Sequence, residues 1–205
     1  MSQNVKKNVW IVNQYASTQA TGFGGRSFYL GREFARQGHS VTIIAASYTH
    51  LLHKSPDVVD RLTTEKIEEN MQFLWVKVPR YQSARSKGRV LNWFRFALAM
   101  RHVPKHISSS HPDVIICSSP SLISWLGVEW LSKKINTKLI FEMRDIWPLT
   151  LTEIGHVSLY HPFIILLNWV EKRAYKNAHI ITSNMKYAYE HLETIGVSKD
   201  KFYWS

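Results

Sequence analysis

The sequence predicts an α/β fold with a Rossmann-like open parallel sheet and helices on both faces. The first reason is the segment Val9–Val41, in which an apolar stretch, a glycine-bearing loop, an amphipathic stretch and a second apolar stretch follow one another. This order describes a strand, a helix and a strand, and such a unit requires the two strands to be parallel. The second reason is that the alternation continues along the chain without an internal repeat or linker, which predicts a single domain over residues 1–205.

Three apolar stretches in the first part of the chain predict strands, because polar or proline-bearing loops bound them. These strands are Val9–Asn13, Val41–Ala46 and Gln72–Val78. The amphipathic stretch that ends at Gln37 predicts the first helix, and Gly38 closes it. Tyr48–Asp60 indicates a loop, whereas Leu62–Asn70 fits a short strand or a turn.

The rest of the chain continues the alternation. Strands are expected at Asp113–Cys117, Lys138–Met143, His179–Ser183 and Lys201–Trp204, the last of which also fits a linker. Helices are expected at Val90–Val103, Leu122–Lys134, Pro162–Asn177 and Met185–Ile195. Pro104 is expected to bend or end the first of these helices, and the turn Ser118–Ser121 to cap the second. Arg144–His156 is expected to be irregular.

Composition and charge narrow the compartment and the partners. The single cysteine, Cys117, lies in an apolar stretch and is expected to be a buried structural thiol in a reducing compartment. Met1–Lys7 does not resemble a signal peptide, and no apolar stretch reaches the ~20 residues of a membrane span. The net charge of +11 favours an acidic partner, which is nucleic acid, anionic lipid or a phosphorylated substrate.

The pair Gly24–Gly25 lies where the first loop meets the first helix, at the carboxyl edge of the sheet, where open α/β folds bind ligands. Glycine permits positive φ and close backbone approach, and the helix that follows offers unpaired N–H groups to an anion. The pair fits a cradle for a phosphate or sugar, and it equally fits a tight turn without a ligand. The spacings of the dinucleotide and P-loop motifs are absent, which argues against those two kinds of site.

The helix Val90–Val103 carries two apolar faces. One face holds Trp93, Phe96, Met100 and Val103, and the other holds Leu91, Phe94 and Leu98. No Asp or Glu occurs from Arg80 to Pro112. Two apolar stripes flanked by arginines suit a helix that covers the sheet with one side and meets anionic lipid with the other. The alternatives are a deeply packed helix and one that contacts a missing domain. The expected membrane contacts are Arg85, Lys87, Arg89, Trp93, Phe94 and Arg95.

The stretch Glu142–Pro148 leaves a predicted strand at the ligand edge. Arg144 and Asp145 can hold a phosphate and a sugar hydroxyl there, or they can form a pair that only fixes the loop. Trp147 fits a stack against a sugar or a filler of the core, and the role of Glu142 stays open.

The ten histidines do not indicate a metal site. His50/His53 and His102/His106 have helix-like spacings, but no cysteine or carboxylate completes a ligand set. The absence of a G-x-S-x-G elbow and of a Cys/His constellation argues against covalent hydrolysis.

Two parts of the sequence resemble a known family. Gly24–Leu30 and Phe34–Thr42 resemble the Gly-Gly, Leu-Ala and Gly-His-x-Val pattern that opens family 4 glycosyltransferases of the GT-B fold. Phe141–Leu151 and Ser158–Phe163 resemble bacterial members that build O-antigen, capsule or exopolysaccharide, including the fucosamine-transferase-like group. The resemblance extends over nearly the whole chain.

The resemblance implies an amino-terminal, acceptor-side domain whose partner domain for the nucleotide sugar is absent after Ser205. It implies a retaining transferase without metal or cofactor, which takes a sugar from a nucleotide diphosphate and gives it to a lipid-linked glycan. The enzyme would be cytoplasmic and peripheral on the inner face of the cell membrane. This chain alone is expected to bind acceptor or membrane but not to turn over.

The resemblance also implies roles for particular residues. Gly24, Gly25 and Arg26 would bind the donor phosphates, Arg144 and Asp145 would act in catalysis, and Trp147 and Asn13 would contact acceptor or sugar. Many relatives carry a histidine just before the position of Asp145, where this chain has Arg144. The rival hypothesis is a basic α/β module that binds nucleic acid or an anionic membrane without catalysis. With the transferase favoured, no nucleic-acid partner is expected.

Overall fold

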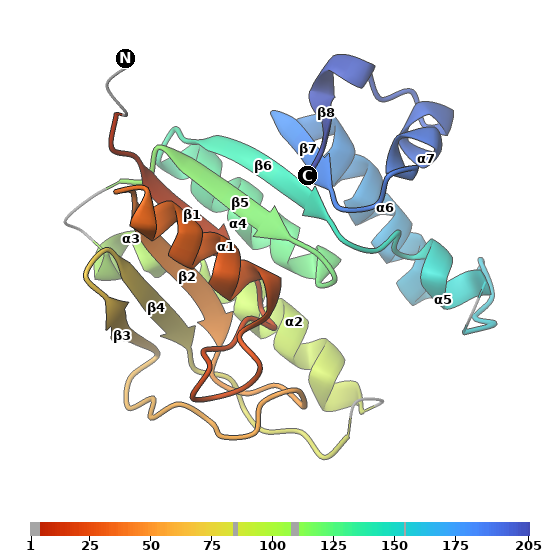
Figure 1. Ribbon diagram of the computed structural model, residues 1–205. Coiled ribbons are helices and arrows are strands. Elements are labelled where there is room, and N and C mark those ends of the chain that lie inside the picture. Colours follow the sequence, from red (N-terminus) through yellow and green to blue (C-terminus); the bar gives the residue numbers. More distant parts are fainter. Residues whose placement is uncertain (1–4, 84–85, 108–110, 154) are drawn as a thin grey trace.

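The computed structural model describes residues 5–83, 86–107, 111–153 and 155–205. Within these residues one sheet holds eight strands in the order β3-β4-β2-β1-β5-β6-β7-β8 (Figure 1). The strands are β1 Asn8–Val12, β2 Ser40–Ala46, β3 Leu62–Glu68, β4 Met71–Val76, β5 Val114–Ser118, β6 Lys138–Met143, β7 Ile180–Ser183 and β8 Phe202–Trp204. All neighbours pair in parallel except β3 and β4, which confirms the predicted Rossmann-like open sheet and adds an antiparallel strand at one edge.

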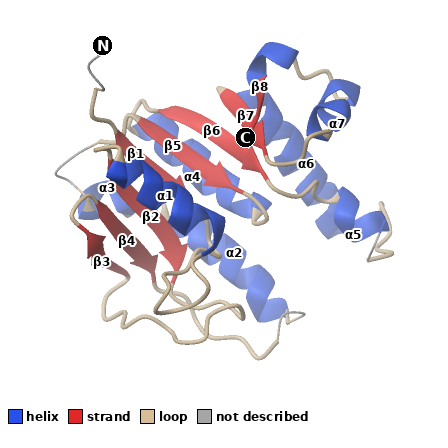
Figure 2. Cartoon of the chain, in the orientation of Figure 1, coloured by secondary structure: helices blue, strands red, loops and turns tan. Residues whose placement is uncertain are grey.

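Helices cover both faces of the sheet, as expected (Figure 2). They are α1 Gly25–Arg36, α2 Lys87–Ala99, α3 Val103–His106, α4 Leu122–Lys134, α5 Leu149–Glu153, α6 Pro162–Asn177 and α7 Ala188–Thr194, with a 3₁₀ turn, η1, at Lys199–Lys201. Helix α1 lies against β1, β2 and β4 on one face, whereas α2, α4, α6 and α7 pack on the other. This division follows from right-handed crossovers that run in opposite directions from β1.

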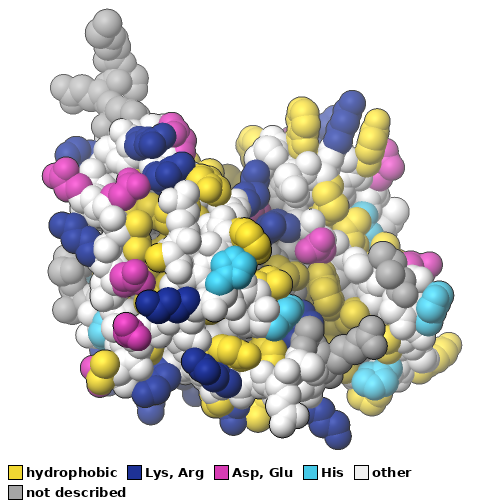
Figure 3. All heavy atoms as spheres, turned by 60° about the horizontal axis from the view of Figure 1, so that its bottom comes forward, with side chains coloured by type: hydrophobic (Ala, Val, Ile, Leu, Met, Phe, Trp, Pro, Cys, Tyr) yellow, Lys and Arg dark blue, Asp and Glu magenta, His cyan; other side chains and the backbone are white. Residues whose placement is uncertain are grey.

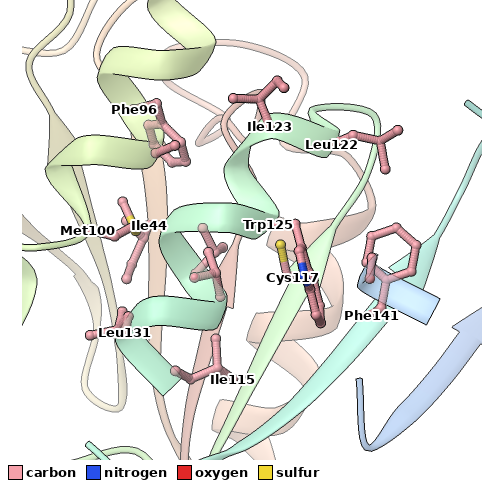
Figure 4. Close-up of a cluster of buried hydrophobic side chains, with 14 of the residues drawn as sticks. Ile44, Phe96, Met100, Ile115, Cys117, Leu122, Ile123, Trp125, Leu131 and Phe141 are labelled. Carbon is pink, nitrogen blue, oxygen red and sulfur yellow. The ribbon is translucent and has the colours of Figure 1, made fainter. Parts of the chain in front are cut away.

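The larger part of the core lies between the sheet and helices α2 and α4 (Figure 4). Phe96 and Met100 approach from the α2 side, Trp125 from α4, and Cys117 from the middle of β5. The Cys117 thiol is buried, as predicted, and burial raises its pKa, so this thiol is a poor nucleophile.

Helices α2 and α4 approach unusually closely at Gly127. A Cβ atom on Gly127 would lie 2.0 Å from the carbonyl oxygen of Ala97, so the two backbones touch where glycine leaves room. The contact fixes the angle at which α2 crosses behind the sheet, and with it the position of the first turn of α2 at the carboxyl edge.

Several elements differ from the sequence-based expectation. The segment Leu62–Asn70, for which the sequence left a short strand or a turn open, contains the antiparallel strand β3, whose backbone pairs with β4. The segment Arg144–His156, which we expected to be irregular, contains the short helix α5. The helix predicted over Val90–Val103 divides into α2 and α3, and Pro104 lies in the first turn of α3. No side-chain capping hydrogen bond forms at Ser121, whose hydroxyl donates to Gln14 instead.

Candidate functional site

A pocket of about 510 Å³ opens at the carboxyl edge of the sheet, where β1 and β6 end. Its lining brings together Asn13, Gly24, Gly25, Arg26, Arg144 and Asp145, which are far apart in the sequence. These residues lie together because the loops that follow parallel strands all leave the sheet at the same edge. Figure 3 shows this edge of the molecule turned forward, with Lys, Arg and His side chains spread among apolar ones.

The glycine turn sits at the start of α1. Gly24 and Gly25 have φ values of 72° and 75°, a region that side chains make unfavourable, so both positions require glycine for the observed turn. The Gly24 N–H donates to Ser17 Oγ, at 3.1 Å. The first turn of α1 carries no acidic residue, and Gly25, Arg26 and Ser27 of that turn line the pocket. The Gly25 N–H donates to the Phe23 carbonyl oxygen at 2.9 Å. The helix end therefore offers positive electrostatic potential to an anion.

Arg26 is held from below by Glu142. The Arg26 Nε atom donates to Glu142 Oε1 at 2.6 Å, and Arg26 Nη2 donates to Ser205 Oγ at 2.9 Å. Glu142 is only 1% exposed, and its second oxygen has no hydrogen-bond partner among the described residues. The role of Glu142, which the sequence left open, is to hold Arg26, because β6 places this carboxylate under the first turn of α1.

Arg144 and Asp145 follow β6 and line the same pocket, but they do not form an ion pair with each other. The Arg144 backbone N–H donates to Ser119 Oγ at 2.9 Å, which fixes the turn. Its side-chain Nε is buried and has no partner among the residues that the structure describes, whereas Asp145 is exposed. The alternative of an Arg–Asp pair that only pins the loop is therefore wrong, and both side chains remain available to a ligand.

Asn13 lines the pocket with an amide that is already engaged on both sides. Its Nδ2 donates to Ser27 Oγ at 2.9 Å, and its Oδ1 accepts from the Tyr15 N–H at 2.9 Å. Asn13 therefore positions the first turn of α1 relative to β1. The expected contact of Asn13 with acceptor or sugar stays a prediction, because each amide atom keeps a second hydrogen-bonding position.

His50 enters the pocket from the loop after β2, which the sequence did not single out as a site. Its Nδ1 lies 2.9 Å from the Tyr81 hydroxyl. Burial, together with the nearby Arg89 guanidinium, lowers the pKa of His50 below its usual value. His50 is therefore neutral at pH 7 and can exchange hydrogen bonds with a bound ligand.

Two of the expected membrane residues turn inward. Trp93 is only 4% exposed, and its indole N–H donates to the Tyr15 hydroxyl at 2.6 Å. The Arg89 Nε also donates to that hydroxyl, at 3.1 Å, and Arg89 lines the site pocket. The expectation that these two residues meet lipid is therefore corrected, because packing against Tyr15 places both beside the site.

The other expected positions fall in three groups. Trp147 lies outside the site pocket and packs edge-on against Trp93, with ring centroids 6.2 Å apart. Lys87 and Arg95 are exposed on α2, and Phe94 is half-buried. Arg85 lies outside the described residues.

The described residues contain no group of three or more His, Cys, Asp and Glu side chains suited to holding a metal ion. Across the same residues, no helix is both long enough and apolar enough to cross a bilayer. Among the residues that the structure describes, the pocket combines the basic side chains Arg26, Arg89 and Arg144 with one carboxylate, Asp145. That balance favours an anionic ligand with at least one hydroxyl group.

Comparison with known sequences agrees with this geometry. The sequence model of the family described as Glycosyltransferase Family 4 matches residues 22–203, which is most of the chain. Among curated proteins, no sequence matches significantly.

Solved structures share the fold at low sequence identity. Sucrose-phosphate synthase from Thermosynechococcus elongatus aligns with a TM-score of 0.70 and 12% identity, over 97% of this chain and 47% of that protein. UGT89C1 of Arabidopsis thaliana aligns with a TM-score of 0.59 and 14% identity, over 97% of this chain and 49% of that one. Another structure of UGT89C1, in complex with UDP-L-rhamnose, aligns with a TM-score of 0.58 and 13% identity, over 97% of this chain and 48% of that one. The chain thus spans about half the length of these structures.

Proposed function

We propose a transferase function from one premise: the chain belongs to Glycosyltransferase Family 4, whose sequence model matches it over residues 22–203. In the proposal this domain is the acceptor-side half of a retaining enzyme. The enzyme moves a sugar from a nucleotide diphosphate sugar to a lipid-linked glycan during synthesis of a bacterial surface polysaccharide of the O-antigen, capsule or exopolysaccharide kind. A second domain, which binds the nucleotide sugar, completes the enzyme, in keeping with the half-length match to solved structures.

The observation that supports this proposal most strongly is the shared pocket of the glycine turn and the Arg144–Asp145 corner. The N–H groups of Gly24 and Gly25 are bonded to Ser17 and Phe23, so the turn contributes close backbone approach and the N-terminus of α1, whose dipole suits the diphosphate of a donor. The Arg144 guanidinium and the Asp145 carboxylate line the same pocket. They suit a phosphate oxygen and a sugar hydroxyl, respectively. The similar structures of UGT89C1 include complexes with UDP and with UDP-L-rhamnose, so related folds hold donors of this class.

The proposed roles follow the geometry. Gly24 and Gly25 admit the donor phosphates closely, and Arg26 stabilises negative charge on the leaving diphosphate. Arg144 orients the donor or acceptor through the part of its guanidinium that lines the pocket, and Asp145 accepts a hydrogen bond from a hydroxyl of the acceptor. Asn13 holds the turn in place through Ser27. We propose no metal and no organic cofactor for this reaction.

The membrane part of the proposal rests on the outer side of α2, α4 and α6, which we call the three-helix face. Its exposed or half-exposed side chains are Lys87, Leu91, Phe94, Arg95, Leu98, Trp130, Lys133, Lys134, Ile165, Trp169, Lys172, Arg173 and Lys176. Phe94, Leu98, Trp130 and Trp169 line a groove on this face. Apolar and aromatic side chains among cations suit a protein that lies on an anionic leaflet. We therefore propose that the enzyme is peripheral on the cytoplasmic side of the cell membrane.

The three helices bury both of their carboxylates. Glu129 accepts from Lys133 at 2.6 Å and from Arg173 at 2.6 Å, and Glu171 accepts from the Tyr175 hydroxyl at 2.8 Å. Burial alone would raise the pKa of Glu129, but the bonds from Lys133 and Arg173 outweigh burial and lower that pKa. No carboxylate of α2, α4 or α6 is therefore exposed to repel an anionic surface.

Replacing Asp145 by Ala in the complete transferase tests the proposed role at the site. The variant removes the Asp145 carboxylate from the pocket, so we expect sugar transfer to fall by about a thousandfold or more, as for loss of a positioned polar group in a transition state. Transfer is measured with radiolabelled nucleotide sugar and extracted lipid acceptor. The matched control is Asp60→Ala, an exposed carboxylate outside the site pocket, which should leave the rate unchanged. Near-normal transfer by Asp145→Ala would remove this residue from the mechanism.

A further inference from the structure

A second pocket, of about 460 Å³, opens next to the site pocket, between the start of α2 and the start of α6. Arg89 lines both pockets, so the two spaces adjoin. The second pocket, which we call the aromatic pocket, is lined by Ser86, Arg89, Val90, Trp93, Trp147, Leu151, Val157, His161, Phe163 and Ile164. Its volume lies within the range of small-molecule sites, about 300–1,000 Å³.

Three rings build one wall of the aromatic pocket. Trp93 stacks on Phe163 with ring centroids 5.8 Å apart, and Trp147 meets Trp93 edge-on. The Trp93 indole N–H is satisfied by the Tyr15 hydroxyl, so the ring presents only its apolar surface to the space. Leu151 and Val157, from α5 and the segment after it, also line the pocket. The ring contacts and the Trp93–Tyr15 hydrogen bond reduce the side-chain ordering that a ligand would otherwise require.

The chemistry of the lining distinguishes between a sugar and a hydrocarbon. Aromatic rings can stack on either, but a sugar also needs carboxylates or amides to fix its hydroxyl groups, because buried hydroxyls without partners are costly. Among the described residues the lining holds neither a carboxylate nor an amide side chain, and its polar members are Ser86, Arg89 and His161. Seven of the ten described lining residues are apolar, which favours a hydrocarbon chain.

The location of the aromatic pocket indicates how a bound hydrocarbon chain would be oriented. At one end the pocket meets the basic site pocket at Arg89. Leu91 and Ile165, the sequence neighbours of the lining residues Val90 and Ile164, are exposed on the three-helix face. A ligand that extends over both pockets would have an anionic head in the site pocket and an apolar chain in the aromatic pocket.

We propose that the aromatic pocket holds the hydrocarbon chain of a lipid phosphate, with the phosphate end turned toward the site pocket. This inference rests on the proposed transferase function, because it assigns the lipid part of the acceptor to a pocket of this chain. The aromatic pocket then selects acceptors that carry a hydrocarbon chain, and it places the glycan end of the acceptor beside Asp145.

Binding of farnesyl pyrophosphate to the 205-residue chain tests the proposal by isothermal titration calorimetry. We expect farnesyl pyrophosphate to bind at least about tenfold more tightly than inorganic pyrophosphate, with geranyl pyrophosphate between them, because each added apolar unit removes surface from water. Leu151→Gln places an amide in the pocket wall at a half-buried position and should weaken farnesyl pyrophosphate about tenfold. Binding of pyrophosphate should not change.

The matched control is Leu149→Gln, which makes the same change on the same short helix at a position 43% exposed and outside the pocket. This control should bind farnesyl pyrophosphate like the original chain, and circular dichroism should show that both variants are folded. The proposal is overturned if farnesyl pyrophosphate binds no better than pyrophosphate, or if the two variants weaken it equally. Displacement of farnesyl pyrophosphate by a lipid-free oligosaccharide, sensitive to Leu151→Gln, would assign the pocket to a sugar instead.

The result is separate from the test of the transferase itself. If the aromatic pocket is wrong but the function is right, the complete enzyme still transfers sugar in an Asp145-dependent manner. If the function is wrong but the pocket is right, farnesyl pyrophosphate binds this chain with the expected dependence on Leu151, and no sugar transfer is seen.

Discussion

At the scale of single residues, Glu142 sets the position of Arg26 and thereby the shape of the glycine turn. The Glu142 carboxylate is 1% exposed and accepts a hydrogen bond from the Arg26 guanidinium at 2.6 Å. Removing Arg26 would leave this buried negative charge without its partner. The second Glu142 oxygen has no partner among the described residues, so no other hydrogen bond there would compensate for the loss of Arg26. The two members of the pair should therefore respond differently to replacement.

Arg26→Ala should destabilise the fold by about 2 kcal/mol or more, because it leaves a buried charge without compensation. Glu142→Gln in the presence of Arg26 should cost less, since the amide oxygen can still accept from Arg26 Nε. The double variant Arg26→Ala with Glu142→Gln should recover part of the loss. Urea unfolding followed by circular dichroism measures all three variants, and equal losses for the two single changes would contradict this account.

The site residues were predictable where a residue type had a strong local reason. Gly24 and Gly25 were predicted from the strand–loop–helix pattern, and their positive φ values agree with it. The role of Glu142 stayed open and His50 was weighed only as a metal ligand, because their contacts join residues far apart in the sequence. Trp93 was misplaced for the same reason, since the Tyr15 hydroxyl that receives its N–H lies in a loop far from α2 in sequence.

At the scale of elements, the contact between α2 and α4 decides how the site is framed. Gly127 allows the α4 backbone to touch the carbonyl of Ala97, and α2 carries Arg89 and Trp93 to the carboxyl edge. Periodicity could predict both helices, but not their separation, because a glycine inside a helix has several possible causes.

Gly127→Ala should destabilise the protein by about 3 kcal/mol, because the new methyl group would meet backbone atoms that cannot move without shifting a helix. Gly31→Ala in α1 is the comparison. There the nearest atoms are side-chain atoms of Ile43 and Val41 at 3.0 to 3.5 Å, and the gain in helix propensity of about 1 kcal/mol offsets part of the crowding. Thermal unfolding should show a much larger loss for Gly127→Ala, and similar losses would refute the role of close helix packing.

There are physical reasons why the sequence did not predict β3 and α5 clearly. β3 carries alternating charged and polar residues that do not distinguish a strand from a turn until β4 offers backbone partners. Helix α5 is only five residues long, below the length at which periodicity is informative. The strands of the central sheet, by contrast, are short apolar stretches, and their burial made them predictable.

At the scale of the whole molecule, the charge of +11 is distributed so that one face can approach an anionic surface. The sequence predicted a membrane-facing helix at α2, but the structure spreads the candidate surface over three helices. Trp130 and Trp169 were not singled out, because α4 and α6 each read as ordinary core helices, and only their assembly leaves these indoles outside.

The 205-residue chain should bind vesicles that contain phosphatidylglycerol, and binding should weaken as salt rises. Trp130→Gln with Trp169→Gln should reduce the fraction bound by about tenfold, because two indoles no longer enter the interface. Co-sedimentation measures the effect. Phe23→Ala, an exposed aromatic residue in the first loop, is the control and should bind normally. Equal binding to neutral phosphatidylcholine vesicles, or no effect of the tryptophan changes, would exclude the three-helix face.

The margins of the sheet bear on how the protein behaves at high concentration. At the β3 margin the exposed residues include Thr64, Lys66 and Glu68. Charged side chains on an edge strand discourage a neighbouring molecule from adding a strand. Concentrated preparations should therefore not grow into fibrils by stacking against the β3 edge.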